Sequence, residues 1–261
     1  MRSVRSALRR FGVDLVRYRP AVAVDRSALA FATLRELRAM PPTEAGSDFL
    51  KYCARNLQKS SAQFMQDLFV LYQLNEKRQG YFVEFGATDG VTLSNTYLLE
   101  TDYGWTGILA EPARCWQSAL QQNRRSQIDT RAVWAESGQQ LEFNEAPWPD
   151  LSTINSFSGG DAHAAGRAQG MQYNVESVSL NDLLKSHAAP REIDYLSLDT
   201  EGSEFDILSR FDFDNYDLRV ITVEHNFTPK RDKILQLLSS KGYRRIFDRL
   251  SDCDDWYVRA G

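Results

Sequence analysis

Residues 81–90 read YFVEFGATDG, a short and mainly apolar run that ends in a turn containing two glycines. Five such residues bounded by glycine are typical of a strand that is buried on both faces of a parallel sheet. Gly86 and Gly90 allow the backbone to turn tightly and to come close to a ligand. The stretch therefore predicts the first strand of an α/β domain, with a ligand-binding turn at its carboxyl end.

Strands and helices alternate along the chain beyond this stretch. Apolar runs predict further strands at 106–110, 128–133, 193–198, 218–223, 243–248 and 255–259. Helical patterns fall at 94–103, after Pro112, at 180–186, after Ser203 and at 230–240. This alternation favours a Rossmann-like fold, with a mostly parallel seven-stranded sheet and helices on both faces. The last two strands have no helix between them, which indicates an antiparallel edge.

The chain divides into an N-terminal helical extension, residues 1–60, and a main domain, residues 61–261. Within the extension, residues 1–20 are rich in arginine and carry apolar residues at helical spacing. We favour packing of this stripe on the domain or on a second subunit, with an anionic membrane surface as the alternative. Residues 146–172 interrupt the alternation and predict a lid or substrate loop, with disorder as the alternative.

Composition restricts the class of partner and the compartment. The formal net charge is −4, whereas nucleic-acid-binding proteins usually carry an excess of basic residues. The three cysteines are scattered without metal-ligand spacing, which suits a reduced cytoplasm. No apolar run reaches the roughly 18 residues of a membrane span, and no secretory signal follows the basic N-terminus. We therefore expect a cytoplasmic protein, located at the inner membrane surface if residues 1–20 bind lipid.

The turn after the first strand predicts a nucleoside site. Glu84 would meet a cationic or amino group, and Glu111, 27 residues later at the end of the next strand, would accept ribose hydroxyls. Asp89 would repel a pyrophosphate, so S-adenosylmethionine fits better than a dinucleotide. The alternative is structural: the glycines serve the turn alone, and Glu111 stabilises a helix start.

A second polar group follows the strands at 193–198 and 218–223. Asp199, Glu201, Glu224 and His225 would converge over one crevice, where they could bind a divalent ion such as Mg²⁺. Alternatively, Asp199, Glu224 and His225 would take a proton from a substrate hydroxyl. The less specific interpretation makes His225 an ordinary satisfied polar residue.

These residues resemble the FkbM family of methyltransferases. The resemblance spans about 62–258 and is carried by 82–90, 94–96, 99–100, 107–112, 193–204 and 223–226. It implies a class I methyltransferase fold, S-adenosylmethionine as donor, and O-methylation of a sugar or polyketide hydroxyl. It also implies that the run 199–202 borders the reacting centre.

The predicted cofactor-binding set combines the turn context with this resemblance and comprises Glu84, Gly86, Thr88, Asp89, Gly90, Asn95, Glu111 and Pro112. The predicted activity is O-methylation of a sugar, glycan or related secondary metabolite, as in polysaccharide biosynthesis. The alternatives are a nucleotide-sugar or NAD-dependent enzyme, a binding module that keeps the fold, and a membrane-surface adaptor. A small-molecule or glycan acceptor is the expected partner, and self-association into a homo-oligomer is a further prediction.

Overall fold

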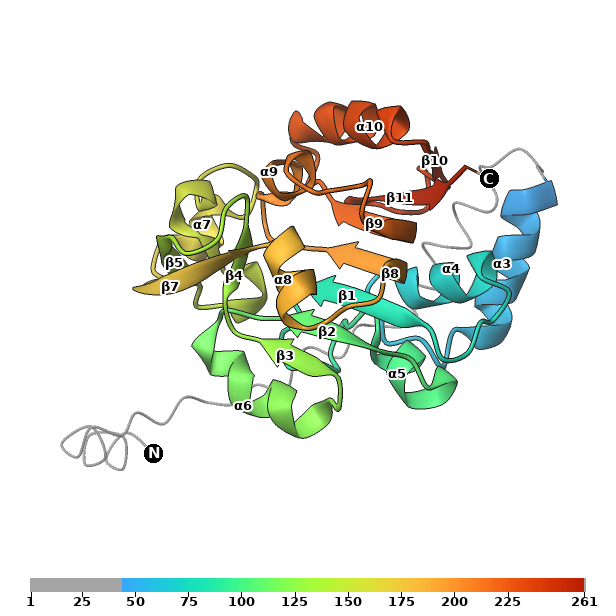
Figure 1. The fold of residues 1–261 in the computed structure, drawn as a ribbon, viewed down its shortest axis with the longest axis horizontal. Helices are drawn as coiled ribbons and strands as arrows, with labels where there is room; N and C mark the ends of the chain where they lie inside the picture. Colours follow the sequence, from blue (N-terminus) through green and yellow to red (C-terminus); the bar gives the residue numbers. More distant parts are fainter. Residues whose placement is uncertain (1–43, 261) are drawn as a thin grey trace.

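A computed structural model describes residues 44–260 of the chain (Figure 1). The predicted amphipathic stretch at 1–20 lies outside the described residues, and so does most of the predicted 1–60 extension. Its last part is the helix α3 (Glu44–Asn56). No helix in the described range has the length and apolarity needed to cross a membrane.

Seven strands form the main sheet, in the order β10-β11-β9-β8-β1-β2-β3. β1 pairs in parallel with β2 on one side and with β8 on the other, and Glu84 stands opposite both Leu109 and Ser197. The strands are β1 (Tyr81–Phe85), β2 (Thr106–Ala110), β3 (Gln127–Asp129), β8 (Glu192–Leu198), β9 (Asp217–Glu224), β10 (Tyr243–Ile246) and β11 (Asp254–Arg259).

The sheet is mixed, which corrects the prediction of a mostly parallel sheet. Four neighbouring pairs are parallel, from β3 across to β9. β11 then pairs antiparallel with β9, and β10 pairs antiparallel with β11. The connection between β10 and β11 is short and contains no helix. A parallel pair would need a longer crossover, so β11 runs antiparallel to β10.

Helices cover both faces of the sheet, as predicted. Successive side chains of a strand point to opposite faces, so Phe82 and Val83 enter different apolar clusters. The cluster around Phe82 includes residues from α3, α4 (Gln66–Gln73), α5 (Tyr97–Tyr103) and α6 (Arg114–Asn123). The cluster around Val83 includes residues from α8 (Leu180–Ser186), α9 (Glu204–Ser209) and α10 (Lys230–Ser240).

A second sheet of four strands, in the order β4-β7-β5-β6, was not predicted. The single strand predicted at 128–133 is split between β3 in the main sheet and β4 in this one. The strands are β4 (Ala132–Trp134), β5 (Gln140–Glu145), β6 (Thr153–Ile154) and β7 (Met171–Ser179). β5 and β7 are exposed over much of their length, so their sequences lack the apolar run that marks a buried strand.

The 146–172 segment is folded and belongs largely to this second sheet. Between β5 and β7 it forms two short 3-10 helices, the strand β6 and the helix α7. These elements are separated only by short connections. These elements are η1 (Pro149–Leu151), η2 (Asn155–Phe157) and α7 (Ala164–Arg167). The structure thus shows regular elements where disorder was the alternative, and the role of the segment as a lid stays a prediction.

Candidate active site

The parallel strands end on the side of the domain that carries the second sheet. In Figure 1 the arrowheads of β1, β2, β8 and β9 all point toward β5, β7 and α7. Ligands of open α/β sheets bind beyond the carboxyl ends of the strands, so this edge is the expected place for a site. Most of the predicted polar residues lie at or just beyond the carboxyl ends of these strands, and Asn95 precedes α5.

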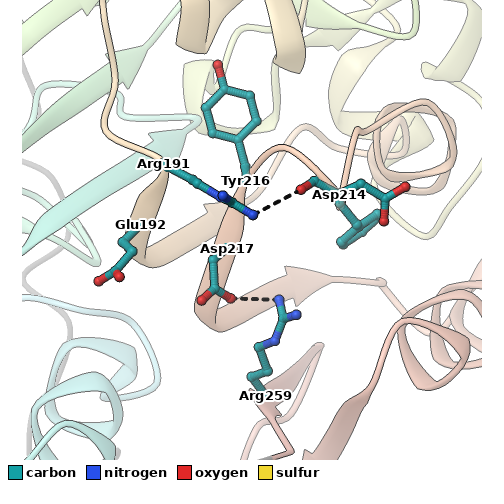
Figure 2. Close-up of a pocket in the computed structure, with 7 residues that line it drawn as sticks. Arg191, Glu192, Asp214, Tyr216, Asp217 and Arg259 are labelled. Carbon is teal, nitrogen blue, oxygen red and sulfur yellow. Dashed lines mark hydrogen bonds and ion pairs between the residues drawn. The ribbon is translucent and has the colours of Figure 1, made fainter.

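A surface hollow also lies at the opposite edge of the sheet, where the parallel strands begin rather than end. Figure 2 shows it at the amino ends of β8 and β9, beside Glu192 and Asp217. Its cationic groups are already paired, because Arg259 contacts Asp217 at 2.6 Å and Arg191 donates to the Asp214 carbonyl at 3.5 Å. We therefore place the candidate site at the carboxyl edge.

Both glycines of the turn after β1 are required by the backbone. Gly86 has a φ of +71°, and a Cβ there would lie 2.4 Å from the carbonyl oxygen of Asp199 at the end of β8. Gly90 has a φ of +80°, and a Cβ there would lie 2.6 Å from the Cγ of Arg124. Only glycine fits these two positions, so the turn can approach the end of β8 closely.

Glu84 is buried and held entirely by protein groups. Its carboxylate accepts hydrogen bonds from the backbone N–H of Asn95 at 2.7 Å, the Thr96 hydroxyl at 2.5 Å and the Ser94 hydroxyl at 3.1 Å. The buried guanidinium of Arg124 lies 3.7 Å away. Burial raises the pKa of Glu84, and Arg124 and these hydrogen bonds oppose the rise. Glu84 thus ties the segment before α5 to β1, and its predicted contact with a ligand stays a prediction.

Asn95 is oriented by the neighbouring strand and keeps a free acceptor. Its side-chain amide donates to the Ser197 hydroxyl of β8 at 2.9 Å. Its carbonyl oxygen Oδ1 is buried and has no hydrogen-bond partner. A buried acceptor without a partner is costly, and a ligand that brings an N–H or O–H donor would satisfy it.

Glu111 closes the turn from the end of β2. Its carboxylate accepts the backbone N–H of Thr88, in the turn after β1, and that of Ala113, just beyond Pro112, each at 2.8 Å. Burial raises the pKa of Glu111 to about 7 against these hydrogen bonds. Each carboxylate oxygen can accept two hydrogen bonds and here accepts one from the backbone. One acceptor position on each oxygen is therefore left for a ligand hydroxyl.

Asp89 shapes the turn from within. Its carboxylate accepts the backbone N–H groups of Val91 and Thr92 and the Thr92 hydroxyl, at 2.7 to 2.8 Å. This arrangement resembles an Asx turn, in which the side chain satisfies the local backbone. The predicted role of Asp89 in cofactor binding stays a prediction.

Three predicted carboxylates come together beyond β8 and β9. Oxygens of Asp199, Glu201 and Glu224, which we call the carboxylate cluster, lie within 4.8 Å of one another. Burial and the charge of Asp254 raise the pKa of Asp199 to about 7. Burial and the charge of Asp199 raise the pKa of Glu224 well above its ordinary value, and its buried Oε2 has no partner. The cluster can therefore hold a proton at neutral pH and exchange it with a hydroxyl.

Glu201 is the member of the cluster that has a cationic partner. It adopts a φ of +58°, and its carboxylate lies 2.5 Å from the Nη2 of Arg167 in the helix α7. Asn226 also donates its side-chain amide to the same oxygen at 3.1 Å. Burial and Asp199 raise the pKa of Glu201, whereas Arg167 lowers it. The 146–172 segment therefore acts directly on the charge of the cluster.

His225 lies apart from the carboxylates. Glu224 shares the face of Thr222, and the next residue along the chain points the other way. Its Nδ1 accepts the backbone N–H of Phe227 at 3.0 Å, and its Nε2 lies 3.8 Å from Asp255. Burial lowers the pKa of His225, so the neutral ring is favoured. The structure thus brings together three of the four residues predicted as metal ligands and leaves His225 outside.

Ser203 and Glu204, in the turn after β8, serve the local structure. Ser203 forms no side-chain cap on α9 and donates instead to the Thr200 hydroxyl at 2.7 Å. Glu204 accepts the backbone N–H groups of Thr200 and Gly202, each at 3.0 Å. Glu204, the first residue of α9, thus orders the turn that leads into the helix.

Sequence reasoning missed four buried residues of this edge. Gln66 donates to Asp254 at 2.8 Å, and Asp254 stands opposite Glu224 in the sheet. Arg124 and Arg167 hold Glu84 and Glu201. Their partners lie tens of residues away, so no local spacing marks them. The resemblance, which begins near Gln66, was the only available signal for that residue.

The carboxylate cluster alone does not establish a metal site. Three oxygen donors at this spacing suit an oxygen-seeking cation. Acidic side chains gather in the same way where a shared proton compensates their charge. The spacing is compatible with Mg²⁺ and adds no further support for it.

The comparison with known families decides the assignment. The model of the methyltransferase FkbM domain matches residues 84–245, which include the β1 turn, Glu111 and the carboxylate cluster. The chain belongs to this family. It is therefore a methyltransferase-family protein, and the resemblance noted in its sequence is confirmed.

Solved structures show only a distant likeness. A precorrin-6y C5,15-methyltransferase from Geobacter metallireducens is 11% identical, with a TM-score of 0.37, over 69% of this chain and 71% of that one. A putative sarcosine dimethylglycine methyltransferase from Galdieria sulphuraria is 11% identical, with a TM-score of 0.34, over 69% of this chain and 62% of that one. No curated protein matches significantly. The assignment thus depends on the family match.

Proposed function

We propose that this FkbM-family protein is an S-adenosylmethionine-dependent O-methyltransferase that acts on a hydroxyl of a sugar, a glycan or a related metabolite. The observation that carries the proposal is the carboxylate cluster, in which Asp199 has a pKa near 7 and touches the Gly86 turn through its backbone. A group with this pKa, at the ligand-binding edge of a methyltransferase fold, suits the removal of a hydroxyl proton.

The polar groups of the edge fit S-adenosylmethionine. Asn95 Oδ1 has no partner, and Glu111 retains acceptor positions, so the edge offers acceptors to a ligand rich in N–H and O–H donors. A pyrophosphate, which has only acceptor oxygens, would face Asp89 and Glu111 and be repelled. We infer that Glu111 holds the ribose hydroxyls and Asn95 the amino-acid part. The cofactor would supply an activated methyl group.

The chain's own contribution to the reaction is alignment and proton removal. Alignment of the acceptor oxygen supplies about 7–11 kcal/mol in well-oriented reactions. The hydroxyl proton passes to the carboxylate of Asp199, while the oxygen gains the methyl group. Glu224, coupled to Asp199, shares the proton. Burial and the charge of Asp199 raise the pKa of Glu201 to about 9 even beside Arg167, and the pKa of Glu224 is also raised well above its ordinary value. Asp199, with a pKa raised only to about 7, is therefore the member that can be ionised and accept a proton near neutral pH.

Methyl transfer itself tests the proposal. We expect the full chain to convert S-adenosylmethionine to S-adenosylhomocysteine with a hydroxylated glycoside as acceptor, detected by mass spectrometry of both products. Parallel reactions with Mg²⁺ and with EDTA separate a metal-dependent reaction from proton transfer by carboxylates alone. Formation of S-adenosylhomocysteine without any methylated oxygen would contradict O-methylation.

Residues 1–20 support a separate prediction about location. Their arginines and apolar stripe predict peripheral binding to anionic membranes if the stripe is not covered by the domain or by a second subunit. If the stripe binds a membrane, the full chain should sediment with vesicles containing phosphatidylglycerol, and a chain lacking residues 1–20 should remain in solution. Packing of the stripe on the domain or on a second subunit, which we favour, predicts that both chains remain in solution. If the full chain also remains in solution, the membrane contact is excluded, and a mass measurement then tests the homo-oligomer.

A further inference from the structure

Phe227 is an exposed aromatic residue in the turn that follows β9. It lies three residues beyond Glu224, the last residue of β9, and its side chain is 69% exposed. Its chain neighbour Asn226 is hydrogen-bonded to Glu201 of the cluster. A large apolar ring in solvent at the ligand-binding edge of a sheet offers a surface for a ligand.

The backbone holds Phe227 in this position against its own preference. Asn226 has a φ of +42° and Phe227 a φ of +55°, a left-handed conformation that a phenylalanine rarely adopts. Hydrogen bonds fix it there, from the Phe227 N–H to His225 Nδ1 at 3.0 Å and from the Thr228 N–H to the His225 carbonyl at 2.8 Å. Conformational strain maintained in this way is concentrated at functional sites.

The ring of Phe227 is largely accessible to solvent. It meets the His225 ring edge-on, with 5.3 Å between centroids and 75° between planes. An aromatic face carries partial negative charge, which suits a flat ligand whose C–H groups carry partial positive charge. The carboxylate cluster, to which the neighbouring Asn226 is hydrogen-bonded, offers hydrogen-bond acceptors. A ligand that contacts both Phe227 and the cluster must therefore also present hydroxyl groups.

We propose that Phe227 and the carboxylate cluster form the acceptor subsite, in which the apolar face of a pyranoside stacks on Phe227 and its hydroxyls reach the carboxylates. A pyranoside combines both required features in one ring. His225 is a positioning residue in this subsite, because its neutral Nδ1 holds the backbone N–H of Phe227. The inference specifies the acceptor class of the proposed methyltransferase and depends on that function.

Binding measurements on the full chain saturated with S-adenosylhomocysteine test the subsite. The probes are methyl hexopyranosides and methyl 6-deoxyhexopyranosides, observed by saturation-transfer NMR with irradiation of the aromatic protons. We expect transfer to the C–H protons of one sugar face. Phe227→Ala should weaken binding about 2- to 10-fold, the range for the loss of one aromatic contact. Phe227→Tyr should preserve it.

Matched variants separate this contact from a general effect. Tyr216 is a half-buried aromatic residue in the hollow at the opposite edge of the sheet, and Tyr216→Ala should leave the transfer unchanged. His225→Ala should weaken sugar binding, and His225→Asn, whose side-chain carbonyl can accept the Phe227 N–H, should restore it. Affinity for S-adenosylhomocysteine should not change in any of these variants.

Two results would overturn the subsite, and a different one would overturn the function. Absence of transfer from the wild-type chain with S-adenosylhomocysteine bound, or equal transfer in Phe227→Ala, would show that Phe227 does not bind a pyranoside. Failure of the wild-type chain to bind S-adenosylhomocysteine would instead contradict the methyltransferase function on which the subsite depends.

Discussion

Asp199→Asn is expected to lower kcat by about 10²–10⁴, the range for the loss of a positioned proton acceptor, and to leave the Kd of S-adenosylhomocysteine nearly unchanged. The amide keeps the shape of the side chain and cannot take the acceptor proton. Steady-state kinetics and isothermal titration of the same preparation measure the two quantities. An equal loss of turnover and of cofactor affinity would show that Asp199 binds rather than reacts.

The same variant should change stability with a defined dependence on pH. Burial and Asp254 raise the folded-state pKa of Asp199 to about 7, above the roughly 3.9 of an unfolded aspartate. The stability contributed by the neutral carboxyl is complete below the unfolded pKa and is lost as the pH rises through 7. Asp199→Asn should therefore raise the unfolding temperature at pH 8 and change it much less at pH 5. A lower unfolding temperature at pH 8 would contradict the raised pKa.

Arg167→Met should lower the free energy of unfolding by about 3–5 kcal/mol, because it leaves buried carboxylates without their cation. The Arg167 side chain is almost fully buried and contacts both Asp161 and Glu201, at 2.7 and 2.5 Å. It also donates to the Leu151 carbonyl at 2.7 Å, so it organises the 146–172 segment as well. Urea unfolding at pH 7 measures the loss.

Two variants serve as controls for Arg167. Arg249→Met removes an exposed arginine and should change the free energy of unfolding by less than about 0.5 kcal/mol. Adding Glu201→Gln to Arg167→Met should recover part of the loss, since one uncompensated charge is then removed. A loss no larger than that of Arg249→Met would show that Arg167 is not essential to the segment.

The strands of the main sheet could be predicted because their apolar runs are continuous. Residues 81–85 and 106–110 form strands exactly where the sequence placed them. β5 and β7 could not be predicted in the same way, since they expose polar residues on one side and pack as a small sheet beside the domain. The predicted strand 128–133 is split because residues 132–134 pair with β7 in the second sheet instead of continuing the main sheet.

The site residues at the ends of strands could be predicted from the sequence. Those that reach the site only because the fold buries them there could not. Asp199, Glu201 and Glu224 converge as expected because parallel strands end at one edge. His225 follows Glu224 directly, yet side-chain alternation turns it to the other face. Arg124 and Arg167 reach their carboxylates only through the tertiary fold, and an arginine in sequence gives no sign that it is buried.

Titration of the full chain with S-adenosylhomocysteine, with Glu111→Ala as its control, tests the central claim most directly. Glu111 is positioned by two backbone N–H groups at the end of β2, where it can accept ribose hydroxyls. We predict micromolar binding to the wild-type chain and its loss in Glu111→Ala, with both proteins folded by circular dichroism. Absence of binding to the wild-type chain, with or without Mg²⁺, would contradict S-adenosylmethionine-dependent methyl transfer.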